Sequence, residues 1–381
     1  MSITPQPTAP DGSGDERLAD LFLYLEEGVS RFRSGDLRGA IAAWEEALSA
    51  NPEHQGAWLD LARARSSVGE YEGAERCARR ALELHPECAE AWFELGNTQT
   101  SLGELDEAVG SYRTALELAP DLIEAWNNLG NTYARQERFE EAIRCYREAV
   151  ERRPTTYQTW FNLGNAHGVL SQMRQAIWAY ENAASHSPDN NDVWYNLAYA
   201  RACCGLLEAA VDGYRRAAQL TPDDYEAWFN LGHAYADLGR DEQAADAYRK
   251  ALAVDQTDHE AWNNLGNVLL RLQRPDEAID CYRRALEITA GYHPSWNNLG
   301  NALEEQGELN EAAEAYARAI ELAPRRPTYL LNRASVLARI GRAEDAVDDL
   351  VHALDTAPEI RGLLPGFKEF GSLLRHPRLR R

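Results

Sequence analysis

The 381-residue sequence is poor in lysine, since Lys250 and Lys368 are its only two and its remaining basic residues are arginines. Acidic residues outnumber lysine and arginine by 61 to 39, which gives a net charge of −22. A surface this negative repels a phosphate backbone. We therefore expect no nucleic acid among the partners.

The sequence also lacks long apolar runs and catalytic motifs. No apolar stretch approaches the ~18 residues of a membrane span, and we expect no membrane partner. The chain contains no GxxxxGK[ST], HExxH or GxSxG motif and no GxGxxG after an expected strand. Its histidines are scattered and its carboxylates fall on solvated faces, so we expect neither an enzyme nor a metal or other cofactor.

What is present is a tryptophan every 34 residues: Trp58, Trp92, Trp126, Trp160, Trp194, Trp228, Trp262 and Trp296. Tyr24 and Leu330 continue the series, giving ten units that begin at residues 21, 55, 89, 123, 157, 191, 225, 259, 293 and 327. Each of these tryptophans is followed three residues later by Leu, and Gly or Ala comes next. An Ala follows 16 residues after the tryptophan, usually with a Tyr four residues later.

Each unit predicts two helices. Counted from the first residue of the unit, positions 4, 7, 8 and 11 are apolar or small, which is the pattern of an amphipathic helix. Ala, Tyr and Ala form a second helical stripe. The glycine at position 8 costs about 1 kcal/mol in helix propensity, so we interpret it as a point of close helix approach. Glycines between the helices, such as Gly69 and Gly103, predict a left-handed residue at the helix end.

This pattern resembles the tetratricopeptide repeat, W-x2-L-G … A-x3-F … P, which has the same period. The resemblance covers residues 21–360 and implies an all-α fold. The expected architecture is a right-handed α-solenoid superhelix of ten helix-turn-helix units, with the first helices lining a concave groove. We assign residues 1–17 to a disordered leader, residues 18–360 to the superhelix, and residues 361–381 to a capping helix with a basic tip. The helical spacing of Phe367, Phe370, Leu373 and Leu374 predicts this cap.

The six cysteines form no CxxC pair. Cys77, Cys145 and Cys281 occupy one equivalent position in separate repeats, too far apart along a solenoid to be bridged. Cys203 and Cys204 are adjacent, where a bridge would be strained. We expect all six thiols to be reduced, which indicates a cytoplasmic protein.

A row of asparagines is the main functional candidate, because positions 6 and 9 point away from the apolar stripe. Position 6 carries Asn128, Asn162, Asn196, Asn230, Asn264, Asn298 and Asn332, and position 9 carries Asn97, Asn131, Asn165, Asn267 and Asn301. A carboxamide has both a donor and an acceptor, so such a row can hold the backbone of an extended peptide. The row looks similar to the asparagine ladder of the O-linked N-acetylglucosamine transferases, and this resemblance implies peptide binding. The alternative is that the asparagines only bond between neighbouring helices.

Two further sets of residues border the expected groove. Position 5 is aromatic at Phe93, Phe161, Tyr195 and Phe229, which either receive apolar side chains of a ligand or pack against the next repeat. Acidic residues make the N-terminal part of the groove negative: Glu26, Asp60, Glu90, Glu94 and Glu124. A partner segment that carries lysine or arginine would be attracted there.

We therefore expect a non-catalytic adaptor that binds an extended, neutral to basic protein segment in its groove. One alternative is a recruiting or regulatory subunit for an enzyme that acts in trans, such as a glycosyltransferase. A second alternative is an assembly scaffold that works through its end caps.

Overall fold

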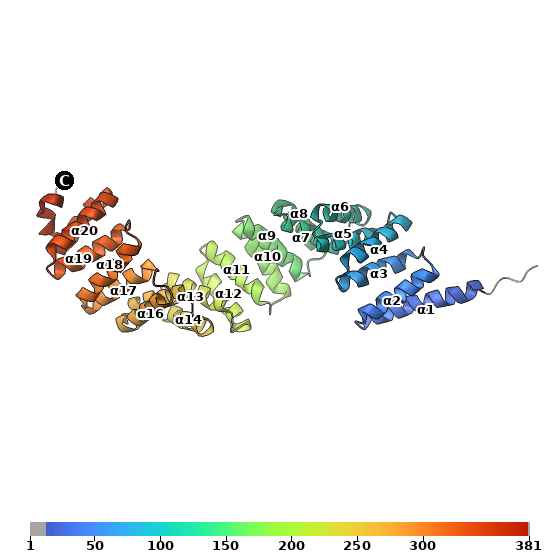
Figure 1. The fold of residues 1–381 in the computed structure, drawn as a ribbon, viewed down its shortest axis with the longest axis horizontal. Helices are drawn as coiled ribbons and strands as arrows, with labels where there is room; N and C mark the ends of the chain where they lie inside the picture. Colours follow the sequence, from blue (N-terminus) through green and yellow to red (C-terminus); the bar gives the residue numbers. More distant parts are fainter. Residues whose placement is uncertain (1–12, 380–381) are drawn as a thin grey trace, which may run out of the picture. The chain divides into compact units, whose positions relative to one another are not determined.

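The computed structural model describes residues 13–379, and this part of the chain is helical throughout, without strands (Figure 1). It forms two compact halves, of which the first ends at Pro188 and the second begins at Asp189. The expected all-α fold of helix-turn-helix repeats is confirmed.

The N-terminal half contains α1 (Ser13–Arg33), α2 (Leu37–Ala50), α3 (Gln55–Ser67), α4 (Tyr71–Leu84), α5 (Ala89–Leu102), α6 (Leu105–Leu118), α7 (Ile123–Arg135), α8 (Phe139–Arg152), α9 (Tyr157–Val169) and α10 (Met173–His186). Residues 13–17 of the expected leader are thus helical, and residues 1–12 lie outside the described part.

The C-terminal half contains α11 (Asn191–Cys203), α12 (Leu207–Leu220), α13 (Tyr225–Asp237), α14 (Asp241–Val254), α15 (His259–Arg271), α16 (Pro275–Ile288), α17 (His293–Gln306), α18 (Leu309–Leu322), α19 (Pro327–Arg339) and α20 (Ala343–Thr356). Within each half every helix packs on the next one along the chain. Odd-numbered helices are the first helices of the repeats and even-numbered helices the second.

The two helices of a repeat approach each other through the glycine at position 8. A Cβ atom placed on Gly130 would lie 2.6 Å from the ring of Tyr146, and one on Gly96 would lie 2.7 Å from the ring of Tyr112. The tyrosine is buried, with Tyr112 only 1% exposed. The wide tyrosine therefore needs the missing side chain opposite it, as the sequence predicts.

The turn between the two helices contains one left-handed residue. The predicted glycines adopt this conformation, with φ of 82° at Gly69 and 84° at Gly103. At the same position three other repeats hold Glu137, Ser171 and Gln273, with φ between 57° and 59°. The turn geometry is thus retained where the glycine is not.

The segment after α20 covers the last helix pair, but it differs from the single capping helix that we expected. It forms five short 3-10 helices: η1 (Pro358–Gly362), η2 (Leu364–Gly366), η3 (Lys368–Phe370), η4 (Leu373–Arg375) and η5 (Pro377–Leu379). Prolines within the first two residues of η1, η2 and η5 interrupt a continuous helix. Phe370 and Leu373 are buried nevertheless, so the segment still seals the apolar end.

The basic tip of this segment is only partly described. Arg378 forms an ion pair with Asp348 on α20, and residues 380 and 381 lie outside the described part.

Candidate functional site

The asparagines of positions 6 and 9 lie along the first helices of each half, and all twelve are half-buried. In each half we call the surface that they form the first-helix face. Because their side chains are partly covered, their hydrogen bonds within the protein decide what they can offer to a ligand.

Each position-9 asparagine accepts a hydrogen bond from the buried tyrosine of its own repeat. The hydroxyl-to-Oδ1 distances are 2.8 Å for Tyr112 to Asn97, 2.8 Å for Tyr146 to Asn131, 2.7 Å for Tyr180 to Asn165, 2.9 Å for Tyr282 to Asn267 and 2.8 Å for Tyr316 to Asn301. Burial raises the pKa of Tyr112 to about 12, so the hydroxyl keeps its proton and acts as the donor.

Four of these Oδ1 atoms also accept from the position-6 asparagine of the following repeat. The Nδ2-to-Oδ1 distances are 2.9 Å for Asn128 to Asn97, 2.9 Å for Asn162 to Asn131, 2.9 Å for Asn298 to Asn267 and 3.4 Å for Asn332 to Asn301. We call this arrangement of tyrosine, position-9 asparagine and next position-6 asparagine the amide relay. The asparagines of the amide relay thus bond between neighbouring helices.

The relay changes in the middle of the chain. Asn264 pairs with His233, which replaces asparagine at position 9, at 3.3 Å. Asn230 donates to the Tyr195 hydroxyl at 3.2 Å and to the carbonyl of Glu226 in its own helix at 2.9 Å. Asn196 donates to the carbonyl of Asp192, also in its own helix, at 2.8 Å.

The position-6 asparagines differ in how many of their N–H donors are already used within the protein. A carboxamide has two N–H donors and a carbonyl oxygen. Asn298 directs Nδ2 to Asn263 as well as to Asn267, and Asn332 directs it to Asn297 as well as to Asn301. Asn128 and Asn162 each use one N–H in the relay. The relay also fixes the orientation of each amide, which lowers the entropy lost when a ligand binds.

The position-5 aromatics pack within their own repeats. Ring centroids lie 6.0 Å apart for Phe93 and Tyr112, 5.8 Å for Phe161 and Tyr180, 5.7 Å for Tyr195 and Tyr214, and 5.9 Å for Phe229 and Tyr248. The four position-5 rings are half-buried. Each therefore keeps part of its surface for contact while its other side rests on the buried tyrosine.

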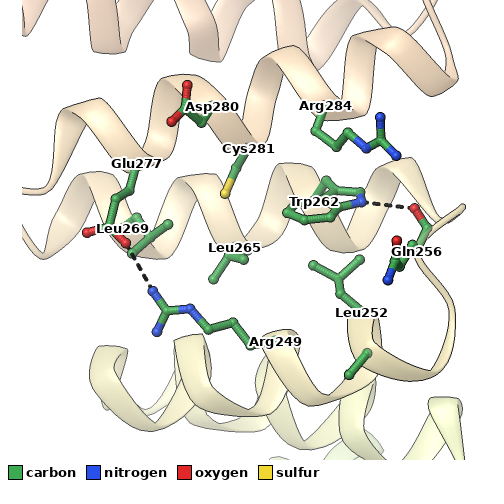
Figure 2. Close-up of a pocket in the computed structure, with 11 residues that line it drawn as sticks. Arg249, Leu252, Gln256, Trp262, Leu265, Leu269, Glu277, Asp280, Cys281 and Arg284 are labelled. Atoms are coloured by element: carbon green, nitrogen blue, oxygen red, sulfur yellow. Dashed lines mark hydrogen bonds and ion pairs between the residues drawn. The ribbon is translucent and has the colours of Figure 1, made fainter.

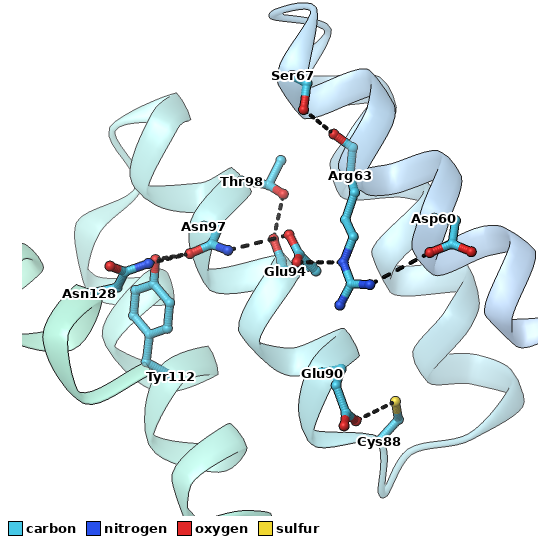
Figure 3. A network of polar contacts seen from close by, with 10 residues as sticks. All are labelled: Asp60, Arg63, Ser67, Cys88, Glu90, Glu94, Asn97, Thr98, Tyr112 and Asn128. Carbon is cyan, nitrogen blue, oxygen red and sulfur yellow. Dashed lines mark hydrogen bonds and ion pairs between the residues drawn. The ribbon is translucent and has the colours of Figure 1, made fainter. Parts of the chain in front are cut away.

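The acidic residues near the N-terminus are partly neutralised by Arg63, which the sequence analysis did not weigh (Figure 3). Arg63 stands at position 9, and its Nε lies 2.8 Å from Glu94, the position-6 residue of the next repeat. Asp60 lies 3.6 Å from Arg63, yet burial raises its pKa. An ion pair between Arg63 and Glu94 thus takes the place of the amide pair at this junction. Asn97 Nδ2 in turn donates a hydrogen bond to the Glu94 carboxylate at 3.3 Å.

The other acidic candidates are exposed. Glu26, Glu90 and Glu124 lie on the surface, and Glu124 pairs with Arg153 at 3.1 Å. They are therefore available to a basic partner, although ion pairs formed at such exposed positions contribute little binding energy.

Cavities lie on the side of the first helices opposite the first-helix face, and the sequence pattern did not predict them. One of about 560 Å³ lies among α14, α15 and α16 and is lined by Trp262, Leu265, Leu269, Cys281 and Asp280 (Figure 2). Cavities of about 910 and 660 Å³ lie at the equivalent places beside Trp296 and Trp126. We call these three the tryptophan cavities. The three cavities share a half-buried tryptophan, Trp126, Trp262 or Trp296. The regular spacing of the tryptophans had predicted a packed core.

Other chemistry is sparse in the described residues. No group of three or more His, Cys, Asp or Glu in residues 13–379 is arranged to hold a metal ion. The six cysteines are free thiols, and burial raises the pKa of Cys145 and of Cys281 to about 12. The part of the chain that the structure describes contains no helix long and apolar enough to cross a bilayer.

A stack of helix pairs with a 34-residue period defines a class of repeat proteins. Tetratricopeptide-repeat family models match residues 25–65, 59–123, 123–156, 204–239, 232–273, 258–325 and 297–359. These matches together cover more than half of the chain, which belongs to the tetratricopeptide-repeat family. Proteins of this family are typically scaffolds for protein–protein interaction.

Several solved structures are similar. The C-terminal part of a TPR repeat-containing protein from Cytophaga hutchinsonii has a TM-score of 0.56 and 15% identity, covering 63% of this chain and 99% of that one. YrrB, titled a TPR protein with an unusual peptide-binding site, has a TM-score of 0.43 and 25% identity, covering 47% and 93%. PilF of Pseudomonas aeruginosa has a TM-score of 0.49 and 16% identity, covering 56% and 96%. A comparison with curated proteins yields no match.

Proposed function

We propose that the protein is a non-catalytic adaptor that binds an extended protein segment on its first-helix face. The amide relay carries this proposal. It holds a row of half-buried carboxamides in fixed orientations at the spacing of the repeats, and fixed amides can pair with backbone N–H and C=O groups at low entropic cost. The resemblance to the asparagine ladder of the O-linked N-acetylglucosamine transferases supports the same function.

The centre of the row is the best place for the ligand. Asn196 and Asn230 donate to carbonyls of their own helices, and Asn230 donates in addition to the Tyr195 hydroxyl of the preceding repeat. A ligand can therefore compete for these two amides without breaking a bond of the amide relay. Tyr195 and Phe229, the aromatic neighbours of these two asparagines, are half-buried and offer apolar contact. Backbone pairing with apolar contacts at intervals is how extended peptides are commonly recognised.

The charge of the protein favours a neutral to basic segment. The net charge is −22, and Glu90 and Glu124 are exposed near the N-terminal end of the row. Arg63 offsets Glu94, so we expect the attraction to act mainly on the rate of association. An enzyme brought to this partner would act in trans.

The test compares two matched double variants of the full chain. Asn196→Ala with Asn230→Ala removes amides on the first-helix face. Asn182→Ala with Asn310→Ala removes amides on second helices, and Asn182 bonds to the carbonyl of Trp178 four residues earlier, just as Asn196 bonds to that of Asp192. Peptides selected by display on the wild type would be measured by fluorescence anisotropy, and circular dichroism would verify folding.

We expect the first double variant to weaken binding about tenfold and the second to leave it unchanged. N-methylation of alternate backbone amides in the peptide should weaken binding to the wild type as well. It removes backbone N–H groups that would donate hydrogen bonds to the asparagine carbonyl oxygens. Equal affinity in both double variants, or indifference to N-methylation, would contradict the proposal.

A further inference from the structure

The tryptophans at position 4 present part of their rings to the tryptophan cavities. Their indole Nε1 atoms already donate to backbone carbonyls. Trp262 donates to the carbonyl of Gln256 at 3.0 Å (Figure 2). Trp296 donates to that of Ala290 at 2.9 Å. With the polar atom satisfied, the ring faces the cavity as an apolar surface. Trp126, Trp262 and Trp296 are all half-buried.

Trp160 is the exception, because it is only 6% exposed. Trp178 of the second helix in the same repeat lies against it, with ring centroids 4.9 Å apart and the planes at 84°. This is the edge-to-face geometry that aromatic pairs prefer. Trp178 itself remains 49% exposed, so its indole covers Trp160 from the solvent side.

Trp178 stands at position 22 of its repeat. The same position holds Arg144, Asp280 and Glu314 in the three repeats with tryptophan cavities, and each of these residues lines its cavity. The chain therefore places an indole of its own where the other three repeats leave space.

A second repeat shows that a cation can also cover the tryptophan. Lys250 Nζ lies 4.4 Å from the ring centroid of Trp228. Charge distinguishes the two kinds of occupant at the cavity beside Trp262. Its lining contains two acids, Glu277 and Asp280, and two arginines, Arg249 and Arg284. Acids and bases therefore balance, which favours a neutral aromatic ring over an added cation.

We propose that the tryptophan cavities are docking sites for an aromatic side chain, an indole above all, presented by a partner protein. The volume of about 560 Å³ beside Trp262 admits an indole, and the cavity beside Trp296 has a tryptophan and a position-22 acid in the same places one repeat further on. The partner occupies the side of the first helices opposite the first-helix face. The protein thereby joins two partners, one on each side, and this second site does not depend on the amide relay.

The experiment uses the full chain and N-acetyl-5-fluorotryptophanamide, whose fluorine signal broadens on binding. Asp280→Trp with Glu314→Trp copies the arrangement of Trp178 into two cavities and fills them. Glu305→Trp adds an indole at an exposed position of α17 outside the cavities and is the matched control. Trp178→Asp does the reverse and opens the covered site on Trp160.

We expect the filled variant to bind the probe about fivefold more weakly than the wild type, while Glu305→Trp binds like the wild type and Trp178→Asp binds more. Circular dichroism verifies folding, and the filled variant keeps the test decisive if Trp178→Asp unfolds. The proposal is overturned if the filled variant binds like the wild type, or if the wild type does not bind. It is equally overturned if N-acetyl-lysinamide binds in place of the aromatic probe.

Discussion

Asn128 donates from Nδ2 to Oδ1 of Asn97 at 2.9 Å, and the two residues belong to successive repeats. The same oxygen accepts the hydroxyl of Tyr112 at 2.8 Å, so one atom joins both helices of its repeat to the next repeat. A function for the asparagine row therefore has to coexist with a structural task. The two tasks can be separated by measuring stability and binding on the same variants.

The relay predicts that its members are energetically coupled. Tyr282→Phe should lower the free energy of unfolding by about 1 kcal/mol, and Asn267→Ala should lower it by more, because Asn267 also accepts from Asn298. The double variant should lose less than the sum of the two, since the bond between Tyr282 and Asn267 is counted in both single variants. Urea unfolding followed by circular dichroism measures this. Additive losses would show that the bond contributes nothing.

Tyr248→Phe is the control for this cycle. The repeat of Tyr248 carries His233 at position 9, so the change should cost less than Tyr282→Phe does.

The ion pair of Arg63 and Glu94 should be replaceable by an amide pair. Glu94 is mostly covered, with 13% of its side chain exposed, so losing its partner leaves a poorly solvated charge. We expect Arg63→Asn alone to cost about 1 kcal/mol and Arg63→Asn with Glu94→Asn to recover most of it. Thermal melts of the single and double variants measure the recovery. A double variant less stable than both Arg63→Asn and Glu94→Asn alone would show that an amide pair cannot replace the ion pair at these two positions.

The fit of glycine against tyrosine predicts opposite signs for two equal substitutions. Gly130→Ala places a Cβ 2.6 Å from the ring of Tyr146 and should destabilise by about 1–3 kcal/mol. Gly110→Ala lies in open space within α6 and should stabilise by up to about 1 kcal/mol, because alanine is the better helix former. Denaturant midpoints of the two variants give the signs. Similar effects from both would mean that close helix approach does not explain the glycine.

Stability should fall in mild acid through His167. This side chain is 2% exposed, its Nδ1 lies 2.7 Å from Gln172, and burial lowers its pKa below the ordinary 6.5, helped by Arg147. As the pH drops through 6.5 the unfolded chain therefore binds a proton before the folded chain does. The free energy of unfolding then decreases, by at most about 1.4 kcal/mol per pH unit for one proton, until the folded-state pKa is passed.

His167→Leu should reduce this dependence, because it removes the titrating group, and the repeat should tolerate the change because leucine occupies the same position at Leu269 and Leu303. Burial lowers the pKa of His233 as well, so part of the slope should remain. Urea titrations at pH values on both sides of 6.5 measure it. His352→Gln, at an exposed histidine of α20, is the control and should keep the slope of the wild type. An unchanged slope in His167→Leu would assign the acid sensitivity to other groups.

The sequence by itself determined the repeated helix pairs. Their contacts are local: the glycine at position 8 and the tyrosine at position 24 belong to one repeat, as do the left-handed turn glycines, so a pattern within 34 residues is sufficient to predict them. For the position-5 aromatics the sequence left two interpretations, contact with apolar side chains of a ligand and packing against the next repeat. The structure adds a contact that neither interpretation contained, with the buried tyrosine of the same repeat, and leaves each ring half-buried.

Only the tertiary structure decided how the asparagines bond and where the chain is hollow. Asn97 and Asn128 meet only once two repeats have stacked, and nothing within one repeat fixes which amide donates to which oxygen. Arg63 could join the row because its long side chain reaches Glu94 from the position of an asparagine. The tryptophan cavities likewise depend on which side chain stands at position 22, since the indole of Trp178 covers Trp160 whereas Asp280 and Glu314 line a cavity beside their tryptophans.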